Sequence, residues 1–419
     1  MRTLRLADTD WVQFIGVLGF VALLSAGYYY NLTFVQLGLI DLGTRLVGMP
    51  SQSVSVIMAV FAVSAFGIAA ITGWTMDRRG WSSNLRVKLR ILFFVIAVQT
   101  ALTVIVGSVS TPPQYLGWVL AGAAAIGVGM PVTFSFMIDL IPVRHRGAVA
   151  AAVAGLAFFA AALYPLQWRI EEFAPVMTAV MIPGLAVLGV VSYRRFAFID
   201  TLAKQHERFG IGRFSRPHPV RTASFAFWGP LVLMFSVFFI DSLGFLRIIE
   251  SPAYISTSWQ SPDVGVRLFI AVTHIVGAGM AGVLYTVFDR RWIWGAVLAL
   301  FAFTHLLYTF PAPSGIDPPL TLPLFYVLAV SFYTTLNFAL WADLSTPSNI
   351  GLHAGLGVGI AGWLASFLST SLALYSEGAG ITLLEHLRYV NALSLLLAVA
   401  FPLTLYFRRM RRLAVRGLS

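Results

Sequence analysis

The chain alternates long apolar stretches with short polar ones along nearly its whole length. Twelve of the apolar stretches approach the length of about 20 residues that a helix needs to cross the hydrocarbon of a bilayer. The predicted spans are 12–34, 53–76, 90–110, 115–138, 147–166, 174–194, 226–249, 265–287, 292–310, 323–342, 351–375 and 387–407. The pattern predicts an all-α polytopic membrane protein.

Six predicted spans lie on each side of the longest polar stretch. We therefore expect an N-terminal six-helix half at 1–195, a central loop at 196–225 and a C-terminal half at 226–419. Within the loop, 196–208 places apolar residues at helical spacing beside basic ones, which predicts a short amphipathic helix lying on the membrane surface.

Similar residues recur at nearly constant separation in the two halves. The matched pairs are Asp77-Arg78-Arg79 with Asp289-Arg290-Arg291, Asp139 with Asp343, and Asn31 with Asp241. Because each half has an even number of spans, both halves have the same orientation in the membrane. The repeat predicts a pseudo-two-fold axis along the membrane normal.

The distribution of basic residues predicts the orientation of the chain. With both termini in the cytoplasm, most of the 28 Lys and Arg residues lie on the inner side. The outer side receives Arg45, Arg169, Arg247, Arg267 and Arg388. We therefore expect a multi-pass protein of the cytoplasmic membrane with both termini in the cytoplasm.

Composition narrows the classes of protein. Hydrophobic residues make up 58% of the chain and charged residues 11%, well below the roughly 25% charged residues of ordinary soluble domains. The net charge is +11, but the basic residues lie between apolar runs, so no nucleic-acid partner is expected. The chain has no cysteine, which excludes disulfides and thiolate metal sites. We expect no metal or cofactor, and a monomer in the bilayer.

Two segments carry a family resemblance. Residues 73–80 read Gly-Trp-Thr-Met-Asp-Arg-Arg-Gly, and basic residues follow in the loop between spans 2 and 3. The second segment runs from Gly122 through Asp139 to Arg146 and Gly147. Together with the six-plus-six layout, these segments resemble the major facilitator superfamily (MFS) over nearly the whole chain. The resemblance implies the MFS fold and a secondary transporter rather than an enzyme.

The resemblance also implies a conformational latch on the inner side. Gly73 allows close helix approach, and Asp77 is expected to accept bonds from free backbone N–H groups where span 11 begins. Arg78 or Arg79 is expected to pair with Asp139. The full predicted latch set is Gly73, Asp77, Arg78, Arg79, Gly80, Asp139, Arg146, Asp289 and Asp343. The alternative interpretation is that these charges only set topology.

The second repeat and two spans depart from the family pattern. Tyr285 stands where the first glycine of the second loop motif should be. Span 4 has no arginine, and span 5 lacks the Gly-Pro motif of proton-coupled drug antiporters in the family. These departures argue against drug–proton antiport.

Ionisable residues inside spans are candidates for a functional site. Asp241, Arg267 and His274 are predicted to converge between spans 7 and 8, where a carboxylate and an imidazole can carry a coupling proton. The alternative is an Asp241–Arg267 pair that only ties two helices. Tyr30 and Asn31 occupy the matching part of span 1. His305, a lone polar residue in its span, is interpreted as an interhelical hydrogen-bonding group.

The leading hypothesis is a transporter that moves a small solute by alternating access. Few charges are expected in the cavity, which favours a neutral, aromatic or amphipathic solute; proton coupling is left open. The acidic residues are scattered singly, so an enzyme is not expected. The alternative is a non-transporting MFS relative that acts as an assembly or delivery factor for membrane pigment–protein complexes.

Overall fold

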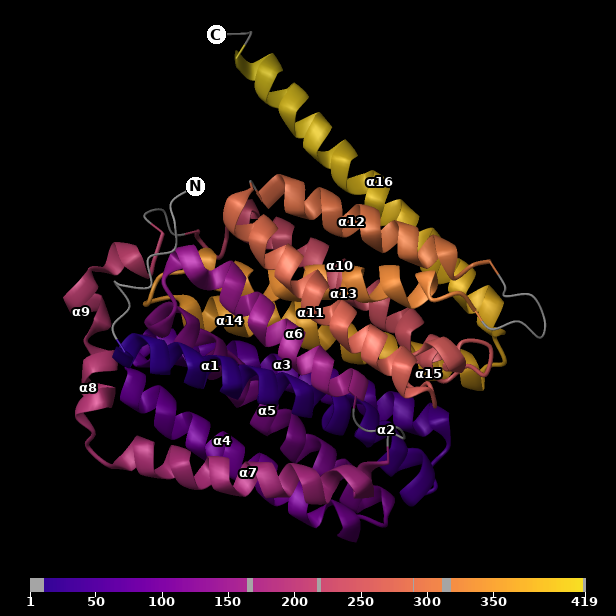
Figure 1. The fold of residues 1–419 in the computed structure, drawn as a ribbon, viewed down its shortest axis with the longest axis horizontal. Helices are drawn as coiled ribbons and strands as arrows, with labels where there is room; N and C mark the ends of the chain where they lie inside the picture. The colour runs from indigo at the N-terminus through magenta and orange to yellow at the C-terminus, as the bar shows by residue number, and fades with distance from the viewer. Residues whose placement is uncertain (1–10, 164–168, 217–219, 289, 311–317, 417–419) are drawn as a thin grey trace.

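The computed structural model describes residues 11–163, 169–216, 220–288, 290–310 and 318–416. These residues form a bundle of helices, with no strand among them (Figure 1). Asp289, a predicted latch residue, lies outside the described residues.

Eleven of the described helices are long and apolar enough to cross a membrane. A twelfth and shorter apolar helix takes the ninth position, which confirms the predicted order of spans. The N-terminal half consists of α1 (Trp11–Tyr30), α3 (Ser51–Arg78), α4 (Leu85–Ile105), α5 (Pro112–Leu140), α6 (Arg146–Leu163) and α7 (Ile170–Tyr193). The C-terminal half consists of α10 (Phe225–Ile249), α11 (Val264–Val287), α12 (Arg290–Leu307), α13 (Thr321–Asp343), α14 (Ile350–Val358) with α15 (Ala365–Gly378), and α16 (Leu383–Arg416).

Local sequence sets several of these helix ends. Asn84 precedes α4, and its side chain accepts from the Val87 amide at 3.2 Å. Asp263 caps α11 in the same way through Gly265, at 2.7 Å. Gly80 ends the turn after α3 with φ of +70°, a left-handed conformation that glycine adopts without steric cost.

The two halves repeat one pattern of packing. In the first half α3 and α4 pack on α5, α4 packs on α7, and α1 packs on α6. In the second half α11 and α12 pack on α13, α12 packs on α16, and α10 packs on α15. Between the halves α3 packs on α14 and α15, and α6 packs on α11. Each of these pairings has its counterpart after exchange of the halves, as the predicted two-fold relation requires.

Three elements differ from the sequence-based expectation. The first span was predicted to end near residue 34, but it continues through the π-helical segment η2 (Asn31–Leu37), α2 (Gly38–Asp41) and η3 (Leu42–Leu46). An Asp41–Arg45 ion pair one turn apart satisfies the charges of this extension. The last helix, α16, runs beyond the predicted boundary at residue 407 and projects from the bundle (Figure 1).

The third difference concerns the central loop. Its predicted amphipathic helix forms as α8 (Ala197–Ala203) and α9 (Gln205–Phe209), but α8 packs against α1, α4 and α5. Ile199 and Leu202 are buried there. The apolar face of α8 therefore covers protein rather than lying on the membrane surface.

Candidate functional site

A cavity of about 900 Å³ lies between the two halves and extends into the N-terminal half. Its lining is almost entirely apolar and aromatic. Among the described residues that line it, Asp241 is the one acidic or basic side chain. Such a volume is within the usual range of small-molecule sites, about 300–1,000 Å³.

Asp241 is held by aromatic hydroxyl and imidazole groups. It is buried in α10, and the Tyr333 hydroxyl on α13 donates to its Oδ2 at 2.6 Å. The Tyr326 hydroxyl donates to its backbone carbonyl at 3.4 Å, and His305 Nε2 lies 3.9 Å from Oδ1. In the described part of the chain no Lys or Arg pairs with this carboxylate. His305 therefore belongs to the surroundings of Asp241, which its isolated position in the sequence did not indicate.

The predicted convergence of Asp241, Arg267 and His274 does not occur. His274 stacks on Phe158 with ring centroids 4.5 Å apart. Its Nε2 accepts from the Trp259 indole at 3.1 Å, and its Nδ1 bonds Ser331 at 2.9 Å. Because an indole N–H can only donate, Nε2 carries no proton in this arrangement. The imidazole is thus a neutral packing group.

Among the described residues, Arg267 forms no ion pair with Asp241 and no hydrogen bond with His274. It is buried near the start of α11, and its Nε has no hydrogen-bond partner among the described residues. The described part of the chain contains no ion pair between Arg267 and Asp241. The tie between spans 7 and 8 that was the alternative interpretation is therefore not formed by this pair.

Span 1 supplies further polar groups to the lining of the cavity. Asn31 begins the π-helical segment η2 and lines the cavity, and its Oδ1 is buried without a partner among the described residues. Tyr30 also lines the cavity but donates or accepts at Thr103 Oγ1, 2.9 Å away. Tyr28 packs edge-on against Phe338 of the other half, with centroids 5.0 Å apart.

Asp77 joins the halves at one end of the bundle, which we call the Asp77 face. Its carboxylate accepts from the backbone N–H groups of Gly351 and Leu352 at the start of α14, at 2.9 and 2.8 Å. Gly73 lies directly against Gly351, where a side chain on either residue would collide with backbone. These contacts have the geometry that the loop motif predicted.

Asp139 corrects one predicted pairing. Its partner is Lys88, which is fully buried in α4, rather than Arg78 or Arg79. Arg78 lies over the Trp74 ring, 5.0 Å from its centroid, and Arg79 lies over the Trp81 ring at 5.7 Å. An aromatic ring close in sequence holds each of these guanidinium groups, so neither reaches Asp139.

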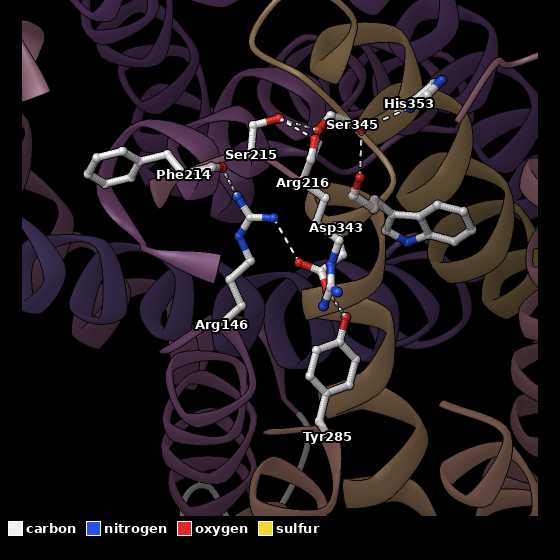
Figure 2. A network of polar contacts seen from close by, with 9 residues as sticks. Arg146, Phe214, Ser215, Arg216, Tyr285, Asp343, Ser345 and His353 are labelled. Carbon is white, nitrogen blue, oxygen red and sulfur yellow. Dashed lines mark hydrogen bonds and ion pairs between the residues drawn. The ribbon is translucent and has the colours of Figure 1, made fainter. Parts of the chain in front are cut away.

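A second network at the Asp77 face joins α6 of the first half to α13 of the second (Figure 2). Arg146 and Asp343 are both fully buried, and their side chains pair at 2.8 Å. The other Asp343 oxygen accepts from Tyr285 at 2.8 Å and from Arg216 at 2.7 Å. Arg146 also donates to the backbone carbonyl of Phe214.

The network includes residues that the sequence did not single out for it. Tyr285 was noted only as a departure from the glycine motif, yet its hydroxyl bonds Asp343. Arg216 and Phe214 come from the central loop, which was expected to be a surface tether. The one sequence feature that could have indicated this role is the presence of basic residues in the loop. That feature does not identify a buried acidic partner.

Comparisons with known proteins place the fold. No family model and no curated protein sequence matches the chain. The human organic anion transporter MFSD10 matches with a TM-score of 0.60 and 17% identity over 93% of this chain and 98% of that one. The proton:xylose symporter XylE of E. coli matches with a TM-score of 0.60 and 16% identity over 92% of this chain and 94% of that one. The nucleoside transporter NupG matches with a TM-score of 0.55 and 11% identity over 94% of this chain and 98% of that one.

The chain is thus a polytopic helical membrane protein with two similarly packed halves around a central cavity. Its fold is that of the major facilitator superfamily, and the solved structures it matches are those of transporters rather than enzymes.

Proposed function

We propose that the protein is a secondary transporter that moves a small neutral or amphipathic solute by alternating access. The observation that carries the proposal is the cavity of about 900 Å³ between the halves, lined by apolar and aromatic side chains with one carboxylate. A lining without Lys or Arg disfavours phosphorylated or other strongly anionic solutes, which proteins usually hold with paired cations.

We further propose that Asp241 carries the coupling proton. A carboxylate inside the membrane without a cationic partner is costly, and such residues commonly form proton relays. The hydroxyl of Tyr333 at 2.6 Å and the imidazole of His305 at 3.9 Å can exchange partners with Asp241 as its charge changes. His274 is assigned no part in this relay, because Trp259 and Ser331 occupy both of its nitrogens.

The Asp77 face is proposed to lie in the cytoplasm. Most Lys and Arg residues fall in the loops of this face or in the terminal segments, and cytoplasmic loops of membrane proteins are enriched in these residues. In this orientation the cytoplasmic side of the molecule is held closed by Asp77 and by the Arg146–Asp343 pair. We also propose that the monomer transports, because both halves that bound the cavity belong to one chain.

The Asp241→Asn variant tests the proposed coupling. Purified protein in liposomes is screened for uptake of labelled neutral aromatic and amphipathic solutes, with and without a pH gradient. We expect Asp241→Asn to retain exchange of solute across the membrane but to lose accumulation driven by the gradient, because an amide cannot release a proton. Solute-dependent proton movement, followed with a trapped pH dye, should disappear in the same variant.

Asp263→Asn is the matched control, since Asn also caps a helix and Asp263 lies outside the cavity. It should behave as the native protein does. Gradient-driven accumulation by Asp241→Asn would contradict the coupling role. Failure of the native protein to move any solute of the panel would contradict transport itself.

A further inference from the structure

The cavity has an arm inside the N-terminal half, between α1 and α7. It is lined there by Gly19, Ala22 and Ala26 of α1 and by Val180 and Gly184 of α7, among others. The helix α7 packs on α4, and α1 packs on α6, but α1 and α7 do not pack on one another along their lengths. The small residues on facing helices are therefore separated by open space.

Glycine positions show how open this space is. An added Cβ at Gly19, Gly27 or Gly184 would meet no atom within 4 Å. Within an apolar stretch of 18 residues in α7, only 6% is buried inside the protein. Both walls of the arm are thus largely uncovered by protein, and they lie at the level of the bilayer hydrocarbon.

The arm is closed at both of its ends. Toward the opposite face, the Ile170 amide donates to Asp41 Oδ2 at 2.9 Å, and Arg45 pairs with Glu171. Toward the Asp77 face, α8 crosses beneath the arm, and Leu202 lies close against Gly16 of α1. The gap between α1 and α7 is therefore a side window with fixed ends.

The interface between the halves is also held at both faces in this conformation. At the Asp77 face, Asp77 bonds the start of α14. At the opposite face, Ser371 donates to the Ser55 carbonyl at 2.7 Å, and Gln36 donates to Thr370 at 3.0 Å. The side window is thus a way into the cavity that does not require the halves to separate.

The chemistry of the lining selects the occupant. Apolar cavities exclude water, so the arm between α1 and α7 suits a hydrocarbon chain. Asp241 is the one charged group among the described residues of the cavity lining, and the other polar side chains there, among them Asn31, Gln36 and Gln99, are neutral. The Asp241 carboxylate accepts hydrogen bonds, and no cationic side chain among the described lining residues balances an acidic head. A matching head group is a hydrogen-bond donor that is neutral or positively charged.

We propose that the gap between α1 and α7 is a lateral portal, through which a single-chain amphiphile with an amine or hydroxyl head enters the cavity from the bilayer. Its chain lies between α1 and α7, and its head reaches Asn31 and Asp241. The proposal rests on the proposed transport function for its biological meaning, but binding through the portal can be measured separately.

Photolabelling of the full-length protein in liposomes tests the portal. The probe is octadecylamine with a diazirine in its chain, and octadecanoic acid with the same diazirine is the matched probe of opposite charge. We expect the amine to label α1 and α7 and the acid to label them about tenfold less, the ratio for about 1.4 kcal/mol. Equal labelling by both probes, or labelling spread evenly over all lipid-facing helices, would overturn the proposal.

Filling the window should block the amine. The double variant Gly19→Leu, Gly184→Leu is expected to lower its labelling about tenfold. The controls are Gly117→Leu on α5 and Gly279→Leu on α11, which also have nothing within 4 Å of an added Cβ. They should label as the native protein does. Unchanged labelling in the double variant would overturn the proposal.

A second measurement does not depend on how well the double variant folds. Because the chain has no cysteine, a nitroxide at Gly184→Cys can be placed alone. Its motion should fall when octadecylamine is added and stay unchanged with octadecanoic acid; the opposite pattern would refute the portal. Labelling that follows the prediction without any solute uptake would support the portal and refute the transport function. Solute uptake by a protein that the amine does not label would support the transport function and refute the portal.

Discussion

Lys88 and Asp139 are 51 residues apart in the chain and form a buried ion pair. Lys88 also donates to the Ser82 carbonyl at 2.9 Å, and its ammonium lies 5.4 Å from the Phe136 ring centroid. These contacts fix the turn after α3 to α5. The pair therefore positions the loop that presents Asp77 to the other half.

Removal of the lysine charge should destabilise the first half strongly. Lys88→Met is expected to lower the free energy of unfolding by about 3–5 kcal/mol, because it leaves a buried carboxylate uncompensated. The double variant Lys88→Met, Asp139→Leu removes both charges and should recover most of the loss. Thermal unfolding in detergent measures both, and a double variant no more stable than the single one would contradict this account.

The sequence located Asp139 but not its partner, and the reason is geometric. The basic residues near the loop include Arg78, Arg79 and Lys88, and each of these three has a side chain long enough to reach a carboxylate. Which of them pairs with Asp139 depends on which side chains are already held by other groups. The rings of Trp74 and Trp81 hold the two arginines, and the pattern of apolar and polar positions does not reveal such local stacking.

Among the elements, α8 is the one whose role the structure changes most. It lines the cavity through Phe198, Ile199 and Leu202, and an Arg86–Asp200 ion pair holds it to α4. The sequence predicted the helix because apolar and basic positions alternate with helical periodicity. It could not show whether the apolar face meets lipid or protein, because both surroundings favour the same residues.

The anchor of α8 should depend on pH. The Arg86 guanidinium holds the pKa of Asp200 below its ordinary value. The stabilisation is thus present above the unfolded pKa of this carboxyl and is lost as the pH falls through the lowered value. Asp200→Asn should imitate the acidic state at neutral pH, with faster amide hydrogen exchange in residues 197–203 by mass spectrometry.

The Glu207→Gln variant on α9 is the control for this experiment, and its exchange should match that of the native protein. Acidification should lower the protection factors of these amides in the native protein, after correction for the slower intrinsic exchange at low pH, and change those of the Asp200→Asn variant little. If α8 in the variant exchanges as slowly as in the native protein, the ion pair does not anchor it.

At the scale of the whole molecule, the number and order of the spans followed from the sequence. The length of each hydrophobic stretch and the repeat of short motifs are properties of local sequence, so they can be recognised without knowledge of how the helices pack. The arm of the cavity between α1 and α7 did not follow, because it depends on where helices fail to touch. The wide separation of α1 from α7 is invisible in two runs of equally apolar residues.

The latch at Asp77 should set the balance between conformations. Asp77→Asn keeps one acceptor oxygen but loses the charge, and hydrogen bonds to charged groups contribute about 1.5–3 kcal/mol. We expect the population open at the Asp77 face to rise about tenfold or more. Pulsed electron paramagnetic resonance between nitroxides at Arg79→Cys and Ser348→Cys measures this population, because the open state has the longer distance. The same distances in native and variant proteins, or an equal change with Asp263→Asn, would argue against the latch.

Two contacts between the halves close the Asp77 face, that of α3 with α14 and that of α6 with α13, and they are built from different interactions. Between α3 and α14 a carboxylate binds neutral peptide groups, whereas between α6 and α13 two arginines share Asp343, and the side chain of Arg216 is 45% exposed. Dissolved ions screen the part-exposed Arg216–Asp343 pair more than the Asp77 bonds to backbone amides, whereas the Arg146–Asp343 pair is buried and is screened little. Ionic strength therefore acts on the link between the central loop and α13, and high salt should loosen Arg216 while both contacts between the halves stay in place.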